Sequence, residues 1–91
     1  KFCSRLFTPS ELAYCRAQRF PERHLSARFA GKVSFFKALG RPMRYRDVEI
    51  TRDQSGAPVL NAPGLEGLKV SLSIAHDGAL SVAEAFVEKS E

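Results

Sequence analysis

The chain has 91 residues, with 14 Lys and Arg against 10 Asp and Glu, and a formal net charge of +4. This length suffices for one domain with a small core, and a content of 44% hydrophobic and 26% charged residues is ordinary for a globular protein, which excludes a disordered chain. No apolar run is long enough to cross a bilayer and the first residues do not resemble a signal peptide, so we expect a single cytoplasmic domain over residues 1–91.

The first predicted helix begins at Thr8 and ends near Gln18. Thr8 suits the N-cap position, and Glu11 can reach back three residues to close a capping box. Cys3 and Cys15 are too few for a disulfide framework and lack the spacing of metal ligands, so we expect idle thiols.

The second predicted helix is the central one and runs from Pro21 to Leu39. Pro21 suits a first helical position, because its missing N–H would have no partner there. Gly40 suits the residue just past the end, which often has a positive φ, and Pro42 prevents the helix from resuming.

Apolar side chains recur along this helix at spacings of four, four and three, which predicts one buried face formed by Leu25, Phe29, Val33 and Phe36. Arg28 and Lys32 lie one turn apart on a flank of that face, and Lys37 is expected close to its buried seam. Together with Phe35, the phenylalanines are too many for one small core, so one of them is expected at a subunit contact.

After the helix, the apolar pattern changes to a period of two, which predicts strands. Val48 and Ile50 are expected to face inward on the first strand. The expected elements are a hairpin of strands 47–52 and 58–60 around a turn at 53–56, then strands 69–75 and 80–88 around a turn at 76–78. The predicted fold is α+β, with the long central helix and the short helix packed on an antiparallel sheet of two hairpins.

Charge is divided unevenly along the chain. Residues 1–46 hold eleven Lys and Arg against two Glu, whereas residues 47–91 hold three basic residues against eight acidic ones. A basic helical half predicts an anionic partner, and nucleic acid, an acidic protein and a phosphorylated cofactor all remain open. Arg16, Arg19 and Arg23 cluster where the two helices meet, and a merely solvated face is about equally expected for them.

The central helix also resembles a known family. Residues 29–40 read FAGKVSFFKALG, which is similar to the Phe/Trp-x-x-Lys-Glu-Ala-x-x-Lys-Ala helix of the 4′-phosphopantetheinyl transferases, of the short holo-acyl-carrier-protein synthase type. This chain departs from the pattern at Val33, where the family has a glutamate. The resemblance extends in family order to the Thr-Pro-x-Glu-Leu helix start at 8–12, the Gly-x-Pro hairpin at 56–58 and the Ser-Ile-Ala-His segment at 73–76.

The resemblance implies transfer of phosphopantetheine from coenzyme A to a serine of an acyl or peptidyl carrier protein, by a homotrimer with active sites between subunits. It implies catalytic roles for Lys32, Lys37 and His76, and coenzyme A contacts for Arg28, Lys32, Ser73 and His76. It also implies Mg²⁺ bound by a helix glutamate and by an aspartate of a Gly-x-Asp strand, neither of which this sequence contains. The loops after the central helix and before the 69–75 strand are shorter than the family's.

Two alternatives stay open. A homologue with a degenerate catalytic site could keep the basic surface and only dock a carrier protein, which Val33 favours. A small basic nucleic-acid-binding domain is a remote alternative, because the sequence contains neither a recognition-helix pattern nor strands that combine aromatic and basic residues. No membrane partner is expected.

Overall fold

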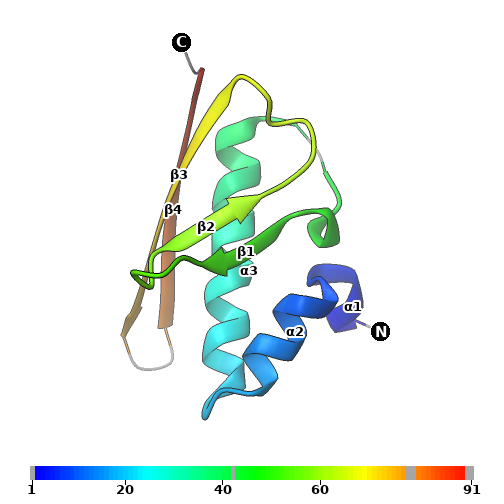
Figure 1. The fold of residues 1–91 in the computed structure, drawn as a ribbon, viewed down its shortest axis with the longest axis vertical. Coiled ribbons are helices and arrows are strands. Elements are labelled where there is room, and N and C mark those ends of the chain that lie inside the picture. Colours follow the sequence, from blue (N-terminus) through cyan, green and yellow to red (C-terminus); the bar gives the residue numbers. More distant parts are fainter. Residues whose placement is uncertain (1, 42, 78–79, 90–91) are drawn as a thin grey trace.

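The computed structural model describes residues 2–41, 43–77 and 80–89, and it places one long helix at the centre of the molecule (Figure 1). In chain order the elements are α1 (Phe2–Leu6), α2 (Pro9–Arg16), α3 (Pro21–Leu39), a 3₁₀ turn (Tyr45–Asp47), β1 (Glu49–Arg52), β2 (Pro58–Asn61), β3 (Leu68–Asp77) and β4 (Leu80–Lys89). In Figure 1 the β3–β4 hairpin runs along one side of α3, and the shorter β1–β2 hairpin crosses obliquely over it. None of the described helices is both long and apolar enough to span a membrane.

The helix ends follow the local signals in the sequence. Thr8 caps α2 with the predicted capping box, in which the Glu11 N–H donates to Thr8 Oγ1 (3.2 Å) and the Thr8 N–H donates to Glu11 Oε1 (2.9 Å). Gly40 ends α3 with φ of 77°, and its N–H donates to the Phe36 carbonyl at 3.0 Å. These features confirm the predicted limits of α3.

The predicted buried face of α3 is wrong. The helix buries a different face, because its small residues let the strands approach closely: a Cβ on Gly31 would lie 2.8 Å from Ile50 Cδ1. Phe29 is 38% exposed, and Leu25, Val33 and Phe36 are only partly buried. The residues that α3 buries are Ala27, Arg28, Gly31, Lys32 and Phe35.

Both predicted hairpins are confirmed, but they form two separate two-stranded antiparallel sheets rather than the one sheet predicted. The first strand, β1, begins at Glu49 and not at the predicted Asp47, which belongs to the 3₁₀ turn. In β1–β2, Ile50 lies opposite Leu60, and in β3–β4, Leu72 lies opposite Ala85. The β3–β4 hairpin packs one face on α3, where Ser34 Oγ donates to the Ala83 carbonyl at 2.8 Å. Strand β3 continues through 76–77, where a turn is predicted, and residues 78–79 lie outside the described part of the chain.

The core lies where α2, α3 and β1 meet. Its fully buried apolar residues include Val48 and Ile50, which confirms that they face inward. Burial raises the pKa of the Cys15 thiol, as expected for an idle cysteine, although Arg28 nearby opposes the shift. The described core consists of Phe7, Cys15, Ala27, Phe35, Val48 and Ile50.

Candidate functional site

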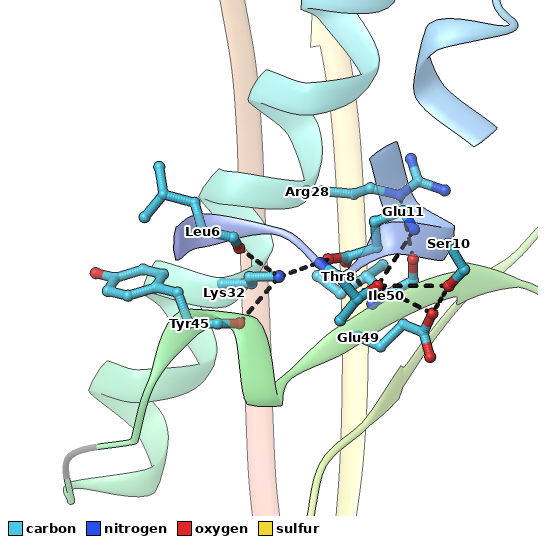
Figure 2. Close-up of polar contacts among 9 residues, drawn as sticks. All are labelled: Leu6, Thr8, Ser10, Glu11, Arg28, Lys32, Tyr45, Glu49 and Ile50. Carbon is cyan, nitrogen blue, oxygen red and sulfur yellow. Dashed lines mark hydrogen bonds and ion pairs between the residues drawn. The ribbon is translucent and has the colours of Figure 1, made fainter. Parts of the chain in front are cut away.

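The Lys32 side chain lies inside the fold and is fully enclosed. Figure 2 shows its ammonium group between three acceptors: Glu11 Oε1 at 2.6 Å, the Leu6 carbonyl at 2.7 Å and the Tyr45 carbonyl at 3.0 Å. These acceptors use all three protons of an ammonium group. Burial lowers the pKa of Lys32, and the hydrogen bond to Glu11 opposes that shift. Lys32 therefore joins α3 to the end of α1, to α2 and to the 3₁₀ turn.

Glu11 holds the other half of this buried pair and is itself fully satisfied. Its Oε2 accepts the Ile50 N–H at 2.8 Å, in addition to the capping bond from Thr8. Nearby, the hydroxyls of Thr8 and Ser10 both donate to Glu49 at the start of β1 (Figure 2). From the sequence, Glu11 is expected only to cap α2. Nothing in the local pattern signals its second role, because its partners lie 21 and 39 residues further along the chain.

Arg28 is also turned inward and is only 3% exposed. Its Nε donates to the Ile50 carbonyl at 3.1 Å, and its guanidinium lies 4.7 Å from the centre of the Tyr14 ring. Beside it is a hollow of about 210 Å³, lined by Ser10, Glu11, Tyr14, Arg28, Ile50, Thr51 and Arg52. Arg28 and Lys32 thus share the buried face rather than its flank.

Lys37 lies on the opposite side of α3. Nine residues separate it from Arg28, which corresponds to a rotation of about 180° and a rise of about 14 Å along the helix. Its side chain is exposed to solvent, so the expected position close to the buried seam is wrong. Val33 lies one turn before Lys37 on the same side.

Ser73 and His76 lie on β3. Leu72 and Ile74 point toward α3, so Ser73, which alternates with them, points to the outer face of the hairpin opposite Glu84. The backbone of His76 pairs with Ser81, and its side chain lies outside the described residues. Within one chain, the structure therefore brings Arg28 and Lys32 to one face and leaves Lys37 and Ser73 apart from them.

A basic cluster lies at the junction of α2 and α3. The guanidinium groups of Arg19 and Arg23 lie 5.3 and 4.5 Å from the centre of the Phe20 ring, which is itself 46% exposed. A hollow of about 310 Å³ opens beside it, lined by Phe20, Glu22, Arg23 and Ser26. The sequence alone predicts that the arginines cluster here, whereas their stacking on Phe20 depends on the turn between the helices.

The donor groups do not fit a metal site on α3. Within residues 2–41, 43–77 and 80–89, no group of three or more His, Cys, Asp or Glu side chains could hold an ion. Magnesium prefers carboxylate and other oxygen ligands, which the apolar Val33 side chain cannot supply. Around Val33, the described part of α3 offers the cation of Lys37 rather than metal ligands.

Comparison with known proteins finds a family that matches most of the chain. Residues 1–85 match the family model of the 4′-phosphopantetheinyl transferase superfamily. The holo-[acyl-carrier-protein] synthase of Geotalea daltonii is 37% identical, over 93% of this chain and 78% of that protein. The holo-[acyl-carrier-protein] synthase of Moorella thermoacetica is 39% identical, over 99% of this chain and 79% of that protein. Its aligned stretch spans 101 positions, more than the 91 residues of this chain, so the relative has residues there that this chain lacks.

Solved structures share the fold. A holo-(acyl-carrier-protein) synthase from Bacillus anthracis, in complex with CoA (3′,5′-ADP), superposes with a TM-score of 0.89 at 27% identity, covering 98% of this chain and 81% of that one. The holo-[acyl-carrier-protein] synthase from Neisseria meningitidis superposes with a TM-score of 0.79 at 32% identity, covering 99% of this chain and 80% of that one. The α+β arrangement of helices on small antiparallel sheets is therefore that of these synthases.

Proposed function

Because this chain belongs to the 4′-phosphopantetheinyl transferase superfamily, we propose that it transfers 4′-phosphopantetheine from coenzyme A to a serine of an acyl or peptidyl carrier protein. The observation that carries this proposal is the likeness to holo-acyl-carrier-protein synthases along nearly the whole chain. The related enzyme that was solved with CoA (3′,5′-ADP) supports coenzyme A as the substrate. We place the activity in the cytoplasm, where it would supply carrier proteins for fatty acid or polyketide synthesis.

The reaction needs positive charge beside the phosphate groups of coenzyme A. The serine hydroxyl gives its proton to a base, and its oxygen attacks the β-phosphorus of the coenzyme. An O–P bond forms and the bond to the 3′,5′-ADP leaving group breaks, while negative charge builds on the phosphate oxygens. Lys37 and Arg23 are both exposed on α3, about 21 Å apart along the helix axis. We propose that coenzyme A binds on this solvent-facing side of α3 with Lys37 near the pyrophosphate. The nucleotide is bonded directly to that pyrophosphate, so it stays at this end of α3 and does not reach Arg23.

Lys32 and Arg28, for which the sequence predicts contacts with coenzyme A, have mainly a structural role in this proposal. Both side chains already have internal partners, so direct contact with the coenzyme stays a prediction for each of them. We propose that Lys32 acts mainly as a positioning residue, which holds the 3₁₀ turn and the start of α2 against the helix that carries Lys37. Ser73 and His76 keep their predicted coenzyme contacts through the assembly described next.

We propose that the active unit is a homotrimer in which β3 of one copy faces α3 of another. Such a contact would bring Ser73 and His76 to Lys37, which a single chain keeps apart. It is supported by apolar side chains on the outer face of β4, where Val82 is 54% exposed and Phe86 is 63% exposed. Light scattering coupled to size exclusion would report the mass of the assembly, and a monomer at micromolar concentration would contradict this arrangement.

A basic surface supports docking of an acidic carrier protein. Exposed arginines lie on α1, at the C-terminal end of α2 and in the turn that follows it, and at the 3₁₀ turn. Their positive field would steer an acidic partner and would weaken as salt screens it. These arginines are Arg5, Arg16, Arg19, Arg44 and Arg46, of which Arg44 already pairs with Asp47.

The test is a transfer assay read by mass spectrometry, with apo carrier protein and coenzyme A, in magnesium or in chelator. A carrier mass increased by one phosphopantetheine supports the transferase. No increase, with a related holo-acyl-carrier-protein synthase active in parallel, would favour the second candidate, a homologue that docks a carrier protein without modifying it. The observation that favours this second candidate is Val33 in place of the family's glutamate.

A further inference from the structure

The family resemblance implies magnesium, yet the residues on α3 do not fit it. The position that the family fills with a glutamate is Val33, whose side chain has no donor atom. Across the described ranges, no three potential ligands gather into a metal-binding group. The chemistry of the donor set, rather than the absence of an ion, is what conflicts with a metal bound at α3.

The same side of α3 carries cations and few anions. Lys37 is exposed, lies one turn beyond Val33 and makes no ion pair among the described residues. Glu22, the carboxylate that α3 carries at its start, lies 11 residues before Val33, or about 16 Å along the axis. A glutamate at position 33 would stand four residues before Lys37 and would partly neutralise it. With valine there, the full ammonium charge faces solvent.

From these observations, and resting on the proposed function, we propose that this chain binds coenzyme A without needing magnesium. The charge of the pyrophosphate is met by side-chain cations, chiefly Lys37, instead of by a metal ion held at α3. A Lys ammonium is a compact point charge that can bind a phosphate group directly. Any Mg²⁺ that accompanies the coenzyme would then be held by groups other than α3.

The experiment is calorimetric titration of coenzyme A into the full chain, in millimolar magnesium chloride and in EDTA at matched ionic strength. For the unchanged chain we expect the two dissociation constants to agree within about twofold. Val33→Glu restores the missing carboxylate and should make coenzyme binding magnesium-dependent, by about 10-fold or more, since losses at metal sites are of that order. In Val33→Gln, the glutamine side chain has nearly the same shape as glutamate but no charge, so coenzyme binding should remain magnesium-independent.

Two further measurements complete the design. Lys37→Gln should weaken coenzyme binding in both buffers, because it removes the cation that the proposal makes responsible. Melting temperatures of all variants verify that each chain is folded under the conditions of the titration.

The outcomes separate this inference from the proposed function. Coenzyme binding to the unchanged chain that strengthens 10-fold or more with magnesium would overturn the inference and leave the transferase standing; a tenfold change is far outside the expected agreement. A Val33→Glu chain that behaves like Val33→Gln would overturn the assignment of position 33. Failure to bind coenzyme A in either buffer would overturn both the inference and the proposed substrate.

Discussion

The buried pair of Lys32 and Glu11 predicts a large loss of stability from a single substitution. In Lys32→Met, a side chain of similar length fills the space without its charge. Glu11 is then left as an unpaired buried carboxylate, and the carbonyls of Leu6 and Tyr45 lose their donor. Removing one partner of a buried ion pair typically costs about 3–5 kcal/mol. The total stability expected for a 91-residue chain is about 5–14 kcal/mol.

Urea denaturation followed by circular dichroism measures the change. We expect Lys32→Met to lower the free energy of unfolding by about 3–5 kcal/mol. The matched control is Lys37→Met on the exposed side of the same helix, which should stay within about 0.5 kcal/mol of the parent chain. The double variant Glu11→Gln with Lys32→Met should lose less than the sum of the single changes, because the two groups are coupled.

A loss below about 1 kcal/mol for Lys32→Met would refute this reasoning. It would mean that the ammonium is not committed to the three acceptors and stays available to a ligand. The measurement therefore separates a positioning role for Lys32 from a direct contact with coenzyme A.

Three further outcomes follow from the packing and the titratable groups. Gly31→Ala should destabilise the chain by about 1–3 kcal/mol, because the added methyl meets Ile50 Cδ1 at 2.8 Å; thermal melting checks it, and a gain in stability, as helix propensity alone would predict, would contradict the close approach. Cys15 should react with a thiol reagent only after denaturation, since burial raises its pKa; fast reaction of native Cys3→Ser protein would count against it. Hydrogen bonds from Ser55 and Ala57 lower the pKa of Asp53, so the turn between β1 and β2 should keep its stabilising effect above the ordinary aspartate pKa and lose it only as pH falls through the lowered value. Carbon-13 NMR titration of the Asp53 carboxyl would show this, and an unshifted midpoint would contradict it.

Local signals in the sequence predict the elements well and their packing less well. The limits of α3 follow from Pro21 and Gly40, and the capping box follows from Thr8 and Glu11, because each depends on neighbours within four residues. The strand pairs follow from the same kind of turn signal.

The buried face of α3 depends instead on which of its surfaces the strands approach. Gly31 lies at that approach and has no side chain to contribute to an apolar pattern, so the pattern favours Phe29 and Phe36 and selects the wrong face. The site shows the same limit. The family motif identifies Lys32 and Lys37 together, yet their environments differ because one of them meets Glu11, a residue 21 positions away. Spacing along a helix cannot reveal such a partner.

The side chains of Glu11 and Arg28, which both bind the backbone of Ile50, also cover part of the free edge of β1. The N–H of Ile50 donates to Glu11 and its carbonyl accepts from Arg28, so the backbone groups that Ile50 would offer to a neighbouring strand on that side are already occupied. A hairpin with strands of only four residues is barely stable alone, and here two side chains supply the hydrogen bonds of a third strand. The same arrangement opposes strand addition from another molecule at the middle of this edge of β1, and such addition is a common route to aggregation. Two charged residues buried beside β1 thus block strand addition at Ile50.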